Sequence, residues 1–214
     1  MTTERNKNLL LFAVCLAQFM VILDVSIVNV ALPSIHHGLH FSTTGLQWVV
    51  NTYTLTFAGF LLLGGRAADL LGRRLVFVTG TAAFALCSLV CALAQSRGLL
   101  LGARALQGLA GALLSPATLS IITSSFREGS ERNRALGAWG AMGGLGASSG
   151  ALLGGILTQT LGWPAIFAVN VPLGAVVVAL ALRVIPAGSR DLAHPAGSDE
   201  GLPQRAGHVL AGLS

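Results

Sequence analysis

Charged residues are scarce in this sequence of 214 residues, of which only 10% are Asp, Glu, Lys or Arg. A soluble domain carries roughly 25% charged residues. Hydrophobic residues make up 53% of the chain, and the mean hydropathy is +0.74. The low charge therefore excludes a water-soluble globular protein. The apolar residues come in long blocks, which excludes a collagen-like or disordered chain despite 27 Gly and 7 Pro. The sequence predicts an integral membrane protein.

Cysteine is also rare in the chain. All three cysteines, at Cys15, Cys87 and Cys91, lie inside apolar blocks, so we interpret them as small buried hydrophobic residues and not as a disulfide or zinc framework. The three histidines between residues 32 and 45 lack the spacing and the nearby carboxylates of a metal site. The chain has no metal-spaced cluster of His, Asp and Glu, and no nucleophile elbow. We therefore expect no metal, no cofactor and no enzymatic activity.

Six apolar blocks are long enough to cross the roughly 30 Å hydrocarbon core of a bilayer as helices. Segments of alternating hydrophobicity that would form a membrane β-barrel are absent. The sequence thus predicts an all-α six-helix membrane domain over residues 9–185, preceded by a short segment 1–8. The predicted spans cover residues 9–31, 46–64, 75–94, 98–122, 135–157 and 166–185.

The basic residues predict how these spans are oriented. Of the 13 Lys and Arg residues, all except Arg97 and Arg104 fall in segments on the same side of the spans. Cytoplasmic loops of membrane proteins are enriched in Lys and Arg, so both termini are expected in the cytoplasm of a multi-pass protein of a bacterial-type inner cell membrane. The net charge of +5 is explained by these short loops, and no nucleic acid partner is expected.

Two charged residues, Asp24 and Arg104, lie well inside predicted spans. A lone charge at the bilayer centre costs roughly 2.5–3.5 kcal/mol or more, so each is expected to have a partner. At 1.5 Å per residue both lie about 10 Å from the outer end of their spans, so they can face one another. A structural ion pair and a carboxylate whose protonation is coupled to transport both fit this pattern.

Polar or small residues recur at helical spacing in two spans. In the second span the stripe is Gln47, Asn51 and Thr54, and in the fourth span it is Arg104, Gln107, Gly108 and Ser115. Such stripes do not face lipid. They predict a water-accessible cavity, although hydrogen bonding between helices explains any single residue as well.

The fifth span has the highest density of glycines. Gly146, Gly150 and Gly154 are spaced four apart and Gly155 follows. Small residues at this spacing predict close contact with a neighbouring helix.

Glycine and charge cluster between the second and third spans, in the order Gly65-Arg66-Ala67-Ala68-Asp69-Leu70-Leu71-Gly72-Arg73-Arg74. Glycines permit a tight turn, Asp69 can cap the next helix or accept from arginines, and Arg73 and Arg74 can anchor to an anionic inner leaflet. The segment resembles the signature loop of the major facilitator superfamily, Gly-x-x-x-Asp-x-x-Gly-Arg-Lys/Arg, at every defining position. The resemblance implies a gating role for Gly65, Asp69, Gly72, Arg73 and Arg74.

Further resemblances follow in the order that this family shows. Residues 23–33 are similar to the first-span motif of its fourteen-span drug:proton antiporter branch, and residues 104–108 to the motif whose arginine is implicated in proton coupling. Residues 146–155 resemble the antiporter motif, with Ala151 where proline is usual. Residues 163–174 resemble the segment that leads into the sixth span, with Pro164 where a basic residue is usual.

The resemblance implies one half of a major facilitator fold, built from two inverted three-helix repeats. It also implies proton-coupled efflux of multiple drugs or other amphipathic or cationic small molecules, with Asp24 and Arg104 in proton coupling. Residues 186–214, rich in Gly, Pro and Ser, are expected to form a flexible cytoplasmic tail.

The chain is accordingly expected to be an amino-terminal half or a truncated product that does not transport alone. Its partners would be the bilayer, protons, a small-molecule substrate and a second transporter half or a second copy of itself. The alternative is a six-helix membrane scaffold or regulatory protein that does not transport.

Overall fold

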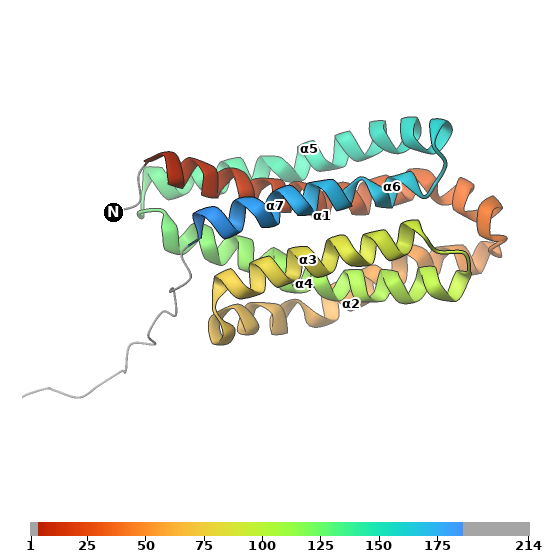
Figure 1. Ribbon diagram of the computed structural model, residues 1–214, viewed down its shortest axis with the longest axis horizontal. Coiled ribbons are helices and arrows are strands. Elements are labelled where there is room, and N and C mark those ends of the chain that lie inside the picture. The colour runs from red at the N-terminus through yellow and green to blue at the C-terminus, as the bar shows by residue number, and fades with distance from the viewer. Residues whose placement is uncertain (1–3, 186–214) are drawn as a thin grey trace, which may run out of the picture.

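The computed structural model describes residues 4–185, so the predicted tail 186–214 lies outside the described residues. The described part is helical and contains no strand. Its helices are α1 Glu4–Leu39, α2 Thr43–Leu71, α3 Arg73–Ala92, α4 Arg97–Ser125, α5 Ser130–Thr160, α6 Ala165–Ala168 and α7 Asn170–Val184 (Figure 1). Six helical segments are long and apolar enough to cross a membrane, because α6 and α7 together form one of them. The all-α, six-span prediction is confirmed.

Several helices extend beyond the predicted spans, most of all α1 and α2. The segment between the first and second spans, expected to be an outer loop from residue 32 to 45, is largely helical, because α1 continues through Pro33 to Leu39. Ile35 in this extension is fully buried in the same apolar cluster as Phe41. Packing of this face therefore outweighs the backbone hydrogen bond that a proline removes.

The predicted loop between the second and third spans is mostly helix as well. α2 continues through Gly65 and Asp69 to Leu71, and α3 begins at Arg73. Gly72 alone reverses the chain, at a φ of 94° that favours glycine. Asp69 does not cap α3, because the residue before that helix is Gly72 and no side chain accepts from the helix start.

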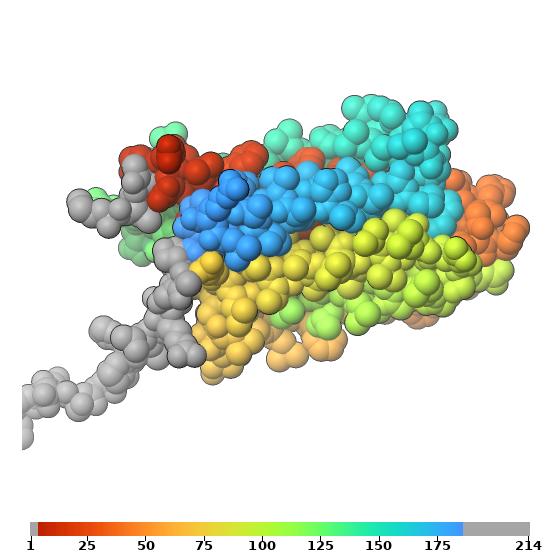
Figure 2. Space-filling model, viewed as in Figure 1, coloured from red at the N-terminus to blue at the C-terminus, as the bar shows by residue number. Residues whose placement is uncertain are grey.

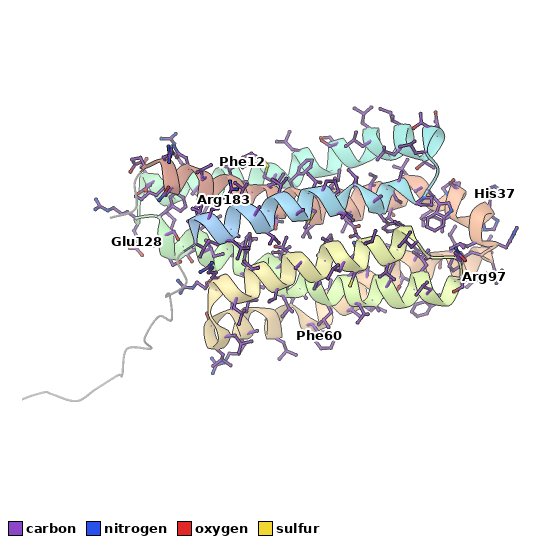
Figure 3. All side chains as sticks on the ribbon, viewed as in Figure 1. Phe12, His37, Phe60, Arg97, Glu128 and Arg183 are labelled. Atoms are coloured by element: carbon purple, nitrogen blue, oxygen red, sulfur yellow. The ribbon has the colours of Figure 1, made fainter. Side chains whose placement is uncertain are left out.

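The connections alternate between the two ends of the bundle. One end holds the start of α1, the Gly72 turn, the connection from α4 to α5 and the end of α7 (Figure 1). Arg183 and Glu128 lie at this end, whereas His37 and Arg97 lie at the other (Figure 3). Apart from Arg97, the Lys and Arg residues of the described connections and helix ends therefore gather at one end.

Helix α1 forms the centre of the bundle. It contacts α5 along one side, and it also contacts α4 and α7. α2 packs on α4, while α3 packs between α4 and α7. Figure 2 shows α7 and α3 side by side on one face of the molecule. Large apolar side chains such as Leu62 and Leu152 point outward, as a lipid-facing surface requires.

Glycines set the distance between α1 and α5. A Cβ added at Gly150 would lie 2.5 Å from Ser26 Cβ, and one added at Gly146 or Gly154 would lie 3.0 Å from side-chain atoms of α1. Ser26 Oγ also donates to the Ala147 carbonyl at 2.7 Å. Gly155 differs from the expectation, because nothing lies within 4 Å of its added Cβ. A residue directly after Gly154 points to another side of the helix.

Alanine substitutions at Gly150 and at Gly155 should change the free energy of unfolding in opposite directions. Gly150→Ala should lower the free energy of unfolding by about 1–3 kcal/mol, because α1 and α5 must separate. Gly155→Ala should raise it by up to about 1 kcal/mol, since alanine favours a helix and no neighbour is displaced. Unfolding of each variant in mixed detergent micelles measures both values. A Gly150→Ala variant as stable as Gly155→Ala would show that α1 and α5 do not pack in this way.

Candidate functional site

Two opposite charges meet inside the bundle. Arg104 Nη1 of α4 lies 2.6 Å from Asp24 Oδ2 of α1, and both side chains are buried, with exposures of 1% and 0%. The expected pairing of these residues is therefore present. A buried charge without a partner would cost several kcal/mol, so each charge makes the burial of the other possible.

Asp24 accepts hydrogen bonds from two further side chains. Gln107 Nε2 donates to its Oδ1 at 2.8 Å, and Asn170 Nδ2 of α7 donates to the same oxygen at 2.9 Å. With Arg104, these side chains surround the Asp24 carboxyl group with hydrogen-bond donors.

Arg104 is held on all sides. Its Nε donates to the Val49 carbonyl of α2 at 3.1 Å, and its Nη1 also donates to Gln107 Oε1 at 2.8 Å. The guanidinium carbon lies 4.3 Å from the centre of the Tyr53 ring and 5.8 Å from that of Phe167. Cation–π attraction is stronger where both groups are desolvated, as they are here.

Gln107 connects this pair to α3. Its Nε2 also donates to Ser88 Oγ at 2.7 Å, and Cys91 Sγ lies 3.8 Å from its Oε1. The network thus joins side chains of α1, α3, α4 and α7 and the backbone of α2. A connected network of this kind stabilises one arrangement of the helices, because any displaced helix would leave polar atoms unpaired.

Asn170, Ser88 and Tyr53 belong to the site although the sequence analysis did not single them out. Asn170 is a lone amide inside an apolar block, and Tyr53 is the single tyrosine of the chain. Polar side chains inside a span tend to be functional or paired. That rule could have selected Asn170 from the sequence, but it could not have identified Asp24 as the residue that Asn170 contacts.

The residues predicted to line a cavity separate into two groups. Gln47, Asn51 and Thr54 are exposed on the outer side of α2. Gln107 and Gly108 are buried, because Gln107 belongs to the network and Gly108 packs against Tyr53 and Thr56. This part of the stripe on α4 is therefore buried against neighbouring helices, Gln107 against α1 and α3 and Gly108 against α2. Ser115 is half-buried.

Among the predicted gating residues, Asp69 forms no ion pair with α5 within residues 4–185. Asp69 is exposed, and Arg132 of α5 pairs instead with Glu128 at 3.0 Å. Arg74 Nη2 donates to the Leu182 carbonyl at 3.3 Å, near the end of α7. Gly65 is half-buried next to Pro116.

A different ion pair joins α1 and α5 at this end of the bundle. Lys7 Nζ lies 2.7 Å from Glu131 Oε1, and Glu131 Oε2 accepts from the Arg127 backbone N–H at 3.3 Å. In the part of the chain that the structure describes, no group of three or more His, Cys, Asp or Glu residues could hold a metal ion.

Removing one member of the buried pair should cost more than removing both. Arg104→Leu should lower the free energy of unfolding by about 3–5 kcal/mol, because Asp24 stays buried without its counter-ion. Asp24→Leu combined with Arg104→Leu should recover part of this loss. A double-mutant cycle in detergent micelles measures the coupling. Additive effects of the two substitutions would contradict a direct pairing.

Comparison with known proteins places the chain in a family. The family model described as "Major Facilitator Superfamily" matches residues 14–211. The chain is 49% identical to the cephamycin export protein CmcT of Amycolatopsis lactamdurans over 176 residues. These aligned residues cover 82% of this chain and 36% of that protein. It is 46% identical to the puromycin resistance protein pur8 of Streptomyces alboniger over 180 residues, and these residues cover 84% of this chain and 36% of that protein.

A third relative is named for resistance to several drugs rather than for one compound. The multidrug resistance protein Stp of Mycobacterium tuberculosis is 43% identical over 179 residues, which cover 84% of this chain and 33% of that protein. The chain thus spans about a third of the length of these relatives. The family match, the identity to these proteins and the six membrane-spanning helices agree, and the chain belongs to the major facilitator superfamily.

Proposed function

We propose that this chain supplies one six-helix half of a proton-coupled exporter of amphipathic or cationic small molecules. Its family membership, its fold and the names of its relatives, which refer to export and drug resistance, support this function. Two inverted three-helix repeats form each half of a major facilitator transporter, and the substrate site lies between the halves near the membrane midplane. The proposed transporter therefore needs a second half in addition to the six helices of residues 4–185.

The buried carboxylate of Asp24 carries the proposal. It is the only Asp or Glu inside an apolar block of the sequence, and it is fully buried against Arg104. Ionisable residues at such positions mark ion pathways and proton relays in transporters. A proton bound at Asp24 removes its charge and weakens its attraction to Arg104, which retains the Val49 carbonyl and Gln107 Oε1 as acceptors. Protonation can therefore loosen α1 from α4 without leaving Arg104 unpaired.

The exposed polar edge of α2 is the proposed surface for the substrate. Gln47, Asn51 and Thr54 are exposed on an otherwise apolar helix, and such residues are costly against lipid. A second half packed on this side would cover the edge and create a cavity with polar walls. The substrate is proposed to bind there, with Asp24 one helix layer away.

The proposed orientation places both termini in the cytoplasm of a bacterial-type cell membrane. The bundle end that carries Lys7, Arg74 and Arg183 would then face the cytoplasm, and Arg97 would face outward, in agreement with the positive-inside rule. Asp69 would lie at the inner end, within reach of a second half rather than of α5.

Transport should require a second half and should depend on Asp24. The chain would be reconstituted in liposomes, alone or with the part of the cephamycin export protein that lies outside the matched region, and ethidium would serve as a cationic probe. We expect movement driven by a proton gradient only from the combined sample, because the substrate site needs both halves. Asp24→Asn should reduce the rate to that of passive leak.

Two results would contradict this function. Gradient-driven transport that Asp24→Asn leaves unchanged would remove Asp24 from the coupling. A complex of the two parts that assembles but moves no probe would favour the non-transporting scaffold. Gln159→Asn is the matched control, because Gln159 is an exposed amide at the end of α5 that takes no part in the network.

A further inference from the structure

Asn170 is placed to respond to the protonation state of Asp24. It is the first residue of α7, directly after Val169, which separates this helix from α6. Its side chain is fully buried, and its Nδ2 donates to Asp24 Oδ1 at 2.9 Å. Its own Oδ1 is buried and accepts no hydrogen bond. A buried carbonyl oxygen without a donor is costly, so a native structure that keeps one needs an explanation.

Protonation of Asp24 changes what its neighbours must supply. An ionised carboxylate only accepts hydrogen bonds, whereas a carboxylic acid also has an O–H that must donate to an acceptor when it is buried. Oδ2 of Asp24 faces the Arg104 guanidinium at 2.6 Å. The proton is therefore placed on Oδ1, which faces the amides of Gln107 and Asn170.

Two of the three partners of Asp24 cannot accept this proton. Arg104 has donors only. The Gln107 amide is fully engaged, because its Oε1 accepts from Arg104 Nη1 and faces Cys91 Sγ, while its Nε2 donates to both Asp24 and Ser88. Turning that amide over would break all of these contacts. Among the three side chains that donate to Asp24, Asn170 is the one with a buried oxygen that accepts no hydrogen bond within residues 4–185.

We propose that Asn170 is a positioning residue that serves both protonation states of Asp24 by a half-turn of its amide. In the ionised state its Nδ2 donates to the carboxylate. When a proton from water neutralises the carboxylate at Oδ1, the amide turns and its Oδ1 accepts the new O–H. The attraction between Asp24 and Arg104 weakens, whereas the hydrogen bonds of Gln107 with Arg104 and Ser88 keep their donors and acceptors. Each state leaves one end of the Asn170 amide unpaired. This inference rests on the proposed function of Asp24 as the proton carrier.

The other groups around the site do not provide this second acceptor. Arg104 of α4 is the charged residue in contact with Asp24. Tyr53 of α2 lies against the guanidinium and Cys91 of α3 against Gln107. α5 meets α1 through glycines, and α6 contributes the Phe167 ring near Arg104. α7 contributes Asn170 itself.

Infrared difference spectroscopy of the chain in lipid bilayers tests this inference. Spectra recorded between alkaline and acidic pH show the C=O stretch of any carboxylic acid that forms, and Asp24→Asn identifies the band of Asp24. A hydrogen-bonded acid absorbs at a lower wavenumber than a free one. We expect the Asp24 band of the unmodified chain in the hydrogen-bonded range. Asn170→Leu keeps the branched shape but removes the acceptor, and it should shift the band to higher wavenumber.

The controls separate this inference from the proposed function. Asn29→Leu should leave the band unchanged, because Asn29 is an exposed amide whose Nδ2 donates to the Val25 carbonyl. An Asp24 band at the free-acid position in the unmodified chain, or one that Asn170→Leu does not move, would overturn the role of Asn170 and leave the proton carrier intact. The absence of any pH-dependent Asp24 band would overturn both. The position of the Asp24 band in the unmodified chain is measured without any variant of Asn170. Misfolding of Asn170→Leu therefore does not decide the test.

Discussion

The burial of one negative charge determines how this bundle is built. Asp24 lies at the centre of α1, the helix with contacts to most of the others, and it has no exposure. Its charge is compatible with that position only because Arg104, Gln107 and Asn170 surround it with donors. These partners come from α4 and α7, so the position of each helix is tied to the charge on Asp24. An ion pair of this kind contributes little net stability relative to apolar packing, but breaking it is costly. A change of charge at Asp24 would therefore alter the contacts between these helices.

Close contacts elsewhere keep the rest of the bundle rigid around that charge. Gly146, Gly150 and Gly154 bring α5 against α1, and Gly108 brings α4 against α2. In lipid, helices associate through such packing and through hydrogen bonds, since apolar side chains gain nothing by leaving an apolar solvent. The tight pairs α1–α5 and α2–α4 are therefore expected to move as units. The polar network between them is the part that responds to protonation.

The sequence was sufficient to predict the six spans and the partners Asp24 and Arg104, because the bilayer imposes a length on each span and a cost on each charge. It did not predict where the helices end. Pro33 and Gly65 looked like the boundaries of loops, but packing of Ile35 and Ala68 extends the helices past them. Periodicity placed Gln107 and Gly108 on one side of α4, yet it did not show that Gln107 packs against α1 and α3 and Gly108 against α2. Asn170 was missed because only the tertiary structure brings α7 to Asp24, and Gly155 was misassigned because its offset by one residue from Gly154 turns it away from α1.

We propose that Asp24 carries the proton in the complete two-half transporter. This role is tested most directly by counting the protons released into a weakly buffered solution when a substrate binds to that transporter. If substrate binding and protonation of Asp24 exclude one another, about one proton should be released per substrate bound, and none from the Asp24→Asn variant. Equal proton release from both proteins, or none from either while the substrate binds, would contradict the account.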